Sequence, residues 1–237
     1  MELNKLSWKL TGGGALGHPR KGYGPDGPSW WFKEENLTHI GLARLDSLRH
    51  QLNRIVVEHI PGDVIEAGVW RGGCCIWMRA VLDSFGDSRT VVVADSFAGF
   101  PEPDVERYPG DVRVHKWRRA NHAYTASLDE VKANFAKYQL VGPVEFVEGS
   151  FRDTLWKLKD RLWSLIRLDG DSYEATHVSL ENLYPGLSRG GYVISDDYGD
   201  PYKTLQAKQA VDDYRMEHNC SPDLEWVDDR CVYWRKQ

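Results

Sequence analysis

Carboxylates follow two apolar runs of this chain, at the point where each run ends. Asp169 closes the run LIRLDG, and Asp196 and Asp197 close the β-branched run GYVISDD. Consecutive strands of one parallel sheet are often neighbours about 4.8 Å apart, so we expect the three carboxylates at one sheet edge. Like charges so close together raise one another's pKa unless a cation neutralises them. An all-oxygen ligand set is typical of a hard ion, and we predict Mg²⁺, with Mn²⁺ or Ca²⁺ as alternatives, held by Asp169, Asp196 and Asp197.

The segment DGDSYE, which begins at Asp169, has other interpretations. An EF-hand loop fails, because Tyr173 and Glu174 stand at positions that need an oxygen donor and a glycine. A phosphatase-like nucleophile at Asp169 leaves the acids of the second run unexplained. Helix capping or a solvated loop position stays open for Asp169 and Asp171, because aspartate is common where a strand turns into a helix.

The segment IEAGVWRGG, residues 65–73, indicates a tight turn beside a ligand. Glu66 ends an apolar run, and Gly68, Gly72 and Gly73 let the backbone turn before the next helix. The segment contains neither GxGxxG nor GK[ST], which disfavours a dinucleotide or a nucleoside triphosphate. Asp95, at the end of the next run VVVADSF, can accept hydrogen bonds from a ribose diol, with a helix N-cap as its alternative role. Together these features suit a nucleoside without a pyrophosphate, such as S-adenosylmethionine.

The elements that must position these residues alternate between strands and helices. We expect a helix from residue 36 to 60, and later helices at 74–85, 127–138, 153–158, 174–187 and 203–218. Strands are expected at 63–69, 90–97, 144–149, 165–170 and 191–197, and an antiparallel hairpin at 223–228 and 231–236. This order predicts a doubly wound, Rossmann-like α/β fold with a mainly parallel seven-stranded sheet that ends in an antiparallel C-terminal hairpin strand. Ligands of such folds bind beyond the carboxyl ends of the strands.

Composition favours one globular domain. The chain has 237 residues, 41% of them hydrophobic, and we predict a Gly- and Pro-rich arm or lid at 1–35 before a single domain at 36–237. A net charge of −5 disfavours nucleic acid as a partner, so the basic stretch 113–122 is interpreted as a solvated lid over the acceptor. No apolar run resembles a membrane span or a secretory signal, and we expect a cytoplasmic protein without membrane contact. Its four cysteines are expected to be reduced thiols.

Several motifs in one order make the chain resemble a known family. The motifs are THIGLARLDSL, GDVIEAGVWRGG, VVVADSFAGFPEPD, FRDTL, RLDGDSYEAT, LYPGLSRGGYVISDDYG and AVDDYR, from about Thr38 to Trp234. They resemble the macrocin O-methyltransferase (TylF-type) family, whose members methylate sugar hydroxyls on antibiotics and related natural products. The resemblance implies a class I methyltransferase fold, S-adenosylmethionine and a divalent metal as cofactors, and a homodimer or higher homo-oligomer.

The resemblance also assigns residues. It implies metal ligands at Asp169, Asp196 and Asp197, and it implies cofactor contacts at Glu66, Gly68, Arg71, Gly72, Asp95, Ser96, Gly149, Ser150 and Asp153. Two features depart from the family pattern: Ser150 stands where a tryptophan is usual, and the arm with its PSWWF segment does not match.

The expected reaction transfers the methyl group of S-adenosylmethionine to a hydroxyl of a deoxysugar in a glycosylated natural product. Asp171 lies two residues beyond a predicted ligand, so it can reach the bound hydroxyl and is our candidate general base, with Asp169 as the other catalytic residue. Vicinal hydroxyls chelate a metal well, which favours a sugar or glycoside as the small-molecule substrate. A nicotinamide-dependent oxidoreductase and a non-catalytic nucleoside-binding protein are the alternatives.

Overall fold

Hydrophobic side chains of the strands point alternately to the two faces of a central sheet in the computed structural model. The structure describes residues 3, 6, 36–121, 124–199, 205–220 and 222–237. The expected arm at 1–35 therefore lies outside the described residues apart from Leu3 and Leu6, and Leu6 is buried. None of the helices in the described part of the chain is long and apolar enough to cross a bilayer.

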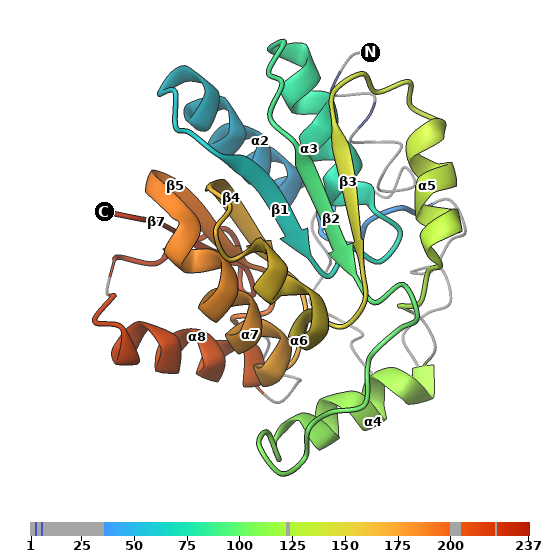
Figure 1. Ribbon diagram of the computed structural model, residues 1–237, viewed down its shortest axis with the longest axis vertical. Coiled ribbons are helices and arrows are strands. Elements are labelled where there is room, and N and C mark those ends of the chain that lie inside the picture. Colours follow the sequence, from blue (N-terminus) through green and yellow to red (C-terminus); the bar gives the residue numbers. More distant parts are fainter. Residues whose placement is uncertain (1–2, 4–5, 7–35, 122–123, 200–204, 221) are drawn as a thin grey trace.

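The sheet has seven strands in the order β3-β2-β1-β4-β5-β7-β6. The first five strands are β1 (Asp63–Ala67), β2 (Val91–Asp95), β3 (Val144–Glu148), β4 (Trp163–Leu168) and β5 (Leu187–Ser195). These five run parallel, whereas β6 (Glu225–Trp226) and β7 (Val232–Arg235) pair antiparallel at the edge next to β5. The predicted fold, with its antiparallel C-terminal hairpin, is confirmed (Figure 1).

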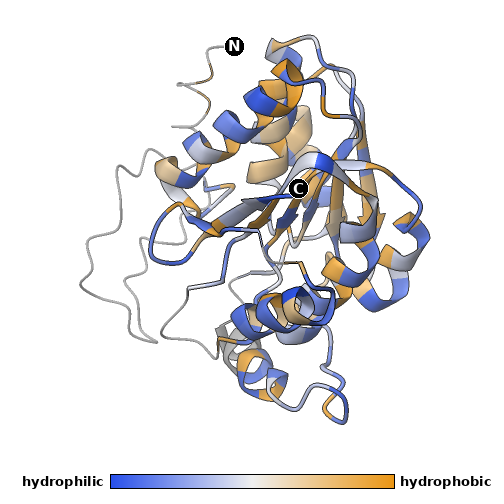
Figure 2. Ribbon diagram, turned by 90° about the vertical axis from the view of Figure 1, so that its left-hand side faces the viewer, coloured by the Kyte–Doolittle hydropathy of each residue, from blue (hydrophilic) through white to orange (hydrophobic). Residues whose placement is uncertain are grey.

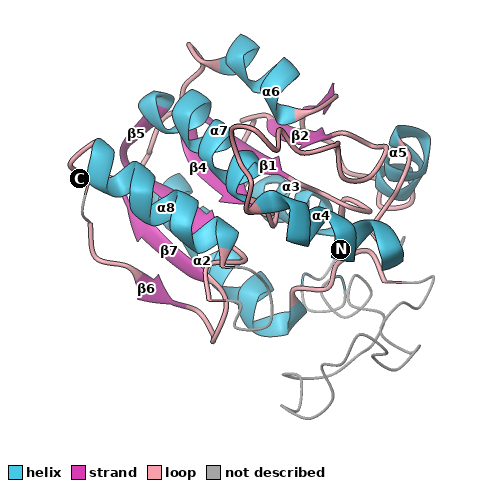
Figure 3. Ribbon diagram, turned by 90° about the horizontal axis from the view of Figure 1, so that it is seen from below, coloured by secondary structure: helices cyan, strands magenta, loops and turns pink. Residues whose placement is uncertain are grey.

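Helices cover both faces of this sheet (Figure 3). One face packs its valines and leucines against α2 (Gly41–Val57), α3 (Gly73–Ser84) and α5 (Leu128–Ala136). The other face packs against α7 (Tyr173–Leu183) and α8 (Gln206–Glu217), with α6 (Phe151–Thr154) and the 3-10 turns η2 (Leu155–Leu158) and η3 (Tyr184–Gly186) alongside. Strands buried on both faces read as continuous apolar runs, and Figure 2 shows largely hydrophobic strands inside helices of mixed character.

Two elements differ from the prediction. The strand β5 begins at Leu187 instead of Gly191, because the ladder with β4 shifts register between Trp163 and Leu165 and Gly190 has a φ of +82°. A pair of glycines that resembles a turn thus forms an irregularity within the strand. The stretch 113–122, which we interpreted as a solvated lid and did not include among the expected helices, falls largely in the helix α4 (Asp111–Asn121), below the carboxyl ends of the strands in Figure 1.

Candidate active site

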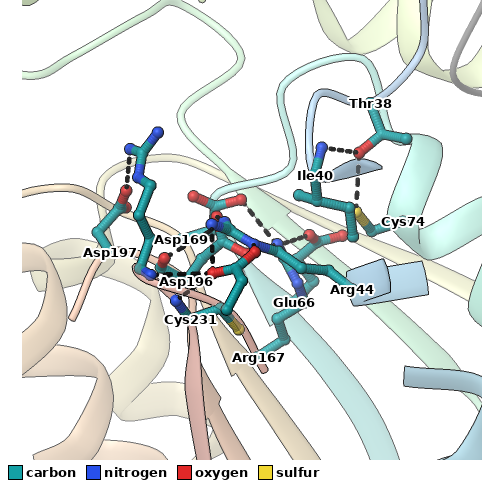
Figure 4. A network of polar contacts seen from close by, with 12 residues as sticks. Thr38, Ile40, Arg44, Glu66, Cys74, Arg167, Asp169, Asp196, Asp197 and Cys231 are labelled. Carbon is teal, nitrogen blue, oxygen red and sulfur yellow. Dashed lines mark hydrogen bonds and ion pairs between the residues drawn. The ribbon is translucent and has the colours of Figure 1, made fainter. Parts of the chain in front are cut away.

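Three carboxylates meet where β4 and β5 end. The register pairs Leu168 with Ser195, so the next residue of each strand, Asp169 and Asp196, continues the same ladder, and the Asp196 N–H donates to the Leu168 carbonyl at 3.0 Å. Asp169, Asp196 and Asp197 each offer an oxygen atom within 4.8 Å of the others (Figure 4). The structure therefore brings the three predicted metal ligands together.

A buried guanidinium group lies directly beneath these carboxylates. Arg167 of β4 is 1% exposed, and its Nη1 donates to Asp169 Oδ2 at 2.7 Å. It also donates to Glu66 of β1 and to Asp196 (Figure 4). The sequence analysis missed this role, although an arginine inside an apolar run is a usable signal, because a buried charge requires partners.

Two further arginines surround the cluster. Arg44 of α2 donates to Asp196 Oδ2 at 2.6 Å and to Asp228 Oδ2 at 2.6 Å, and Arg230 Nη2 lies 3.5 Å from Asp197 Oδ1. When all of these groups are ionised, the five carboxylates and three guanidinium groups of this network carry a net charge of −2. One divalent cation would balance this charge. The carboxylates are Glu66, Asp169, Asp196, Asp197 and Asp228, and the guanidinium groups are Arg44, Arg167 and Arg230.

The electrostatics of the cluster suit a bound cation. Burial, together with the carboxylates of Asp196 and Asp197, raises the pKa of Asp169 to about 8, against the opposing effect of Arg167. Burial likewise raises the pKa of Glu66, although Arg167 again opposes it. A cation among the three oxygens would reverse this repulsion, and oxygen-only ligands suit Mg²⁺, Mn²⁺ or Ca²⁺.

The glycine turn after β1 packs against this site. Gly68 has a φ of +93°, and a Cβ there would lie 2.1 Å from the backbone oxygen of Asp169. Gly72 has a φ of +82° at the N-cap of α3, where a Cβ would lie 2.8 Å from Val131 Cγ1. Both positions require glycine because a side chain is excluded by left-handed geometry and by close packing.

Asp95 connects the glycine turn to β2. Its Oδ2 accepts a hydrogen bond from the Val69 N–H at 2.7 Å, and its Oδ1 accepts one from the Phe97 N–H at 3.0 Å. The neighbouring Ser96 hydroxyl donates to the Gly99 carbonyl at 2.5 Å. The chain forms no helix between β2 and α4, so the helix N-cap alternative for Asp95 is wrong.

The loop after β3 lies beside Asp95. The Gly149 N–H donates to the Asp95 carbonyl at 2.9 Å, and the Ser150 hydroxyl donates to Asp153 Oδ2 at 2.5 Å. The start of this loop thus lies beside the end of β2, and its role in cofactor binding stays a prediction.

Two predicted cofactor residues are turned toward protein groups. Glu66 accepts a hydrogen bond from the Cys75 thiol at 2.8 Å as well as from Arg167. Arg71 lies in the glycine turn, but its side chain donates to the Asn36 carbonyl at 3.2 Å and its Nε lies 3.2 Å from Glu130 of α5. All four cysteines are free thiols.

The N-terminus of α7 is capped by residues other than the predicted acids. The Ser172 hydroxyl accepts from the Ala175 N–H at 3.0 Å. Asp111 of α4 accepts from the Tyr173 N–H at 2.7 Å and from the Glu174 N–H at 2.8 Å. The helix-cap alternative for Asp169 and Asp171 is therefore wrong. Asp111 was missed, because nothing in its own segment indicates a contact 62 residues away.

Asp171 itself adopts a φ of +60°, in the left-handed region that residues other than glycine seldom enter. Such conformations persist where the surrounding structure enforces them, and they cluster at functional sites. This backbone places the predicted general base in the turn between Asp169 and the first residue of α7.

Comparison with known proteins identifies the family. Residues 13–236 match the model of the family described as Macrocin-O-methyltransferase (TylF). The chain belongs to this family. It is 43% identical over 202 residues to the 8-demethyl-8-(2,3-dimethoxy-alpha-L-rhamnosyl)-tetracenomycin-C 4'-O-methyltransferase of Streptomyces olivaceus, a match that covers 84% of this chain and 75% of the relative.

Two other comparisons agree with this assignment. The Mycinamicin III 3''-O-methyltransferase of Micromonospora griseorubida is 40% identical over 203 residues, covering 84% of this chain and 78% of the relative. The solved structure of the O-methyltransferase NovP superposes with a TM-score of 0.85 at 37% identity, and covers 99% of this chain and 98% of NovP. The prediction of a TylF-type O-methyltransferase is confirmed, and the nicotinamide oxidoreductase alternative is set aside.

Proposed function

We propose that this TylF-family chain is an S-adenosylmethionine-dependent and divalent-metal-dependent enzyme that methylates a sugar hydroxyl of a glycosylated natural product. The observation that carries the proposal is the set of three carboxylate oxygens within 4.8 Å, beside the glycine turn at 68–73. The name of the tetracenomycin relative includes a rhamnosyl group and a 4'-O-methyl transfer, which supports a sugar acceptor here.

The cofactor lies, in this proposal, along the turn at 68–73, with its ribose at Asp95 and its base beside Gly149 and Ser150. S-adenosylmethionine supplies an activated methyl group on its sulfonium. Asp95 accepts the Val69 and Trp70 N–H groups on Oδ2 and the Phe97 N–H on Oδ1, so with the Ser96 hydroxyl directed to the Gly99 carbonyl, Oδ1 keeps a lone pair for a ribose hydroxyl. Gly68 and Gly72 fix the path of this turn, because their positive φ and their close packing against Asp169 and Val131 exclude side chains.

The acceptor hydroxyl lies at the edge formed by Asp169, Asp196 and Asp197, which would hold the divalent ion. The ion supplies positive charge that lowers the pKa of a bound hydroxyl and fixes its direction. Asp171 accepts the hydroxyl proton as the acceptor oxygen bonds to the methyl carbon and the carbon–sulfur bond breaks. Because displacement is in line, the main task of the chain is to align the acceptor with the donor.

Calorimetry tests both cofactors. S-adenosylmethionine and NAD are titrated into the full chain, each with Mg²⁺ or with EDTA, and methyl transfer to a panel of glycosides is measured in parallel. We expect S-adenosylmethionine to bind and NAD not to bind, and we expect turnover to stop in EDTA. Asp197→Ala should abolish turnover and leave binding of S-adenosylmethionine largely intact. Wild-type turnover that persists in EDTA would refute the metal role.

We propose a homodimer or a higher homo-oligomer as the assembly. Light scattering of the full chain should give a mass at least twice the 27.1 kDa of one chain. A particle of single-chain mass would contradict this.

A further inference from the structure

Charges alternate beneath the three carboxylates in a row that crosses the molecule. Glu66, Arg167, Asp196 and Arg44 follow one another, each in contact with the next, from β1 through β4 and the end of β5 to α2 (Figure 4). Arg44 in turn contacts Asp228 of the β6–β7 hairpin. Asp196 is the only one of them that also belongs to the set of three carboxylates that offers a metal site. The row therefore includes one ligand of that site, Asp196, and through Arg167 it also contacts a second, Asp169.

Both oxygens of Asp196 are held. Arg167 Nη2 donates to Oδ1, and Arg44 Nη1 donates to Oδ2 at 2.6 Å and also lies 3.4 Å from the Asp196 carbonyl. An ionised carboxylate offers about four lone-pair sites, so each oxygen keeps one for another partner. Guanidinium groups on both oxygens stop the carboxylate from rotating, and they fix the direction of its remaining lone pairs.

Arg44 is held in turn by the hairpin. Its Nε and Nη2 donate to the two oxygens of Asp228 at 2.6 and 3.0 Å, the bidentate geometry of a guanidinium on a carboxylate. Asp228 is fixed by the Arg230 and Cys231 N–H groups, both at 2.9 Å from its Oδ1. The side chains of Arg44 and Asp196 are 9% and 8% exposed, so water has little access to their contact, whereas the side chain of Asp228 is 32% exposed.

We propose that Arg44 is a positioning residue of the divalent-cation site, which holds Asp196 in its ligating orientation and is itself aligned by Asp228. The inference rests on the proposed function, because it concerns the same cation. Groups that orient a metal ligand through hydrogen bonds typically contribute about 10- to 100-fold in metal affinity.

Whether removal of Arg44 weakens or strengthens cation binding distinguishes a positioning role from a purely electrostatic one. A guanidinium beside the site repels a cation, so if Arg44 acted by charge alone, its removal would leave the site more negative and tighten cation binding. If Arg44 acts by positioning, its removal frees the Asp196 carboxylate and weakens binding. Arg44 is a better probe than Arg167, because loss of Arg167 would also strand the buried carboxylate of Glu66.

Mn²⁺ binding to the full chain, measured from the electron paramagnetic resonance signal of free Mn²⁺, tests the inference without any turnover. We expect Arg44→Met to weaken Mn²⁺ binding by about 10- to 100-fold. Arg44→Lys keeps the positive charge but loses the planar, bidentate guanidinium group, and this variant should also bind Mn²⁺ more weakly than the wild type. Asp228→Asn can still accept the hairpin N–H groups, and should cause a smaller loss in the same direction.

Arg49→Met is the matched control, because Arg49 lies on the same helix in an exposed pair with Asp46. It should leave Mn²⁺ affinity at the wild-type value. Thermal unfolding and binding of S-adenosylmethionine report whether each variant is folded, and the Lys and Asn variants carry the test if Arg44→Met does not fold. Wild-type protein that binds no Mn²⁺ would overturn the proposed function and this inference with it. Variants of Arg44 that bind Mn²⁺ as tightly as the wild type, or more tightly, would overturn this inference alone.

Discussion

In the proposed mechanism, the carboxylate of Asp171 removes the proton of the acceptor hydroxyl. Asn tolerates the left-handed backbone at this position and has nearly the same shape, but it cannot take a proton. We expect Asp171→Asn to lower kcat by about 100-fold or more, the usual contribution of a general base. Affinities for Mg²⁺ and S-adenosylmethionine should stay at wild-type values in calorimetry, and the exposed variant Asp160→Asn should retain full turnover. A kcat near that of the wild type would remove Asp171 from the mechanism.

The carboxyl of Asp169 should make the stability of the cation-free protein depend on pH. Its pKa in the folded chain is about 8, above the value of about 3.9 in an unfolded chain. The folded state therefore binds the proton more tightly, and its free energy of unfolding falls as pH rises between these values. Asp169→Asn removes this titration, so its unfolding free energy should fall less between pH 5 and 8.

Urea denaturation in metal-free buffer at several pH values measures this difference. The variant Asp46→Asn, at an exposed carboxyl, should follow the wild type. Saturating Mg²⁺ should remove the wild-type decline, because the ion binds the ionised form. If the unfolding free energies of the wild type and Asp169→Asn fall equally with pH in metal-free buffer, the raised pKa of Asp169 is contradicted.

At the scale of elements, the carboxylate of Asp111 joins α4 to the N-terminus of α7. Asp111 is 2% exposed and accepts two first-turn N–H groups of α7. We expect Asp111→Ala to lower the free energy of unfolding by about 1 to 3 kcal/mol, because two buried donors lose their acceptor. Hydrogen exchange at Tyr173 and Glu174 should accelerate.

The control is Asp129→Ala, which removes an exposed acid from the first turn of α5. It should change stability by a few tenths of a kcal/mol, as expected for an exposed charge near a helix N-terminus. An equal effect of both variants would mean that Asp111 acts only through its charge.

Sequence patterns predict the helices and strands better than they predict the contacts between them. Apolar runs reveal β1, β2, β4 and β5 because most of their residues are buried, whereas β3, at the edge of the sheet, is partly exposed. The position of the acids after β4 and β5 follows from the adjacency of these two strands. Arg44 and Asp228 could not be paired from sequence, because 184 residues separate them and only the folded sheet brings α2 to the hairpin. The helix α4 was missed because its sequence, DVRVHKWRRAN, has few apolar residues to show a helical period.

At the scale of the whole molecule, cation binding should raise the free energy of unfolding of the whole fold. A ligand that binds only the folded state stabilises it by about 2.7 kcal/mol at 100 times its Kd. For a chain of this size that corresponds to a rise in Tm of about 5 to 10 °C. We expect this rise on addition of Mg²⁺ to the wild type at pH 7.5, measured by calorimetric scanning. Asp197→Ala, or NaCl at equal ionic strength, should give no comparable rise.

The backbone contact between Gly68 and Asp169 couples two parts of the proposed site. A Cβ at Gly68 would lie 2.1 Å from the Asp169 oxygen, so the glycine turn and the loop that begins at Asp169 pack directly against each other. Neither can change its path without displacing the other. If the two segments hold the methyl donor and the acceptor as proposed, a substitution that shifts either segment also changes the alignment of the two reactants.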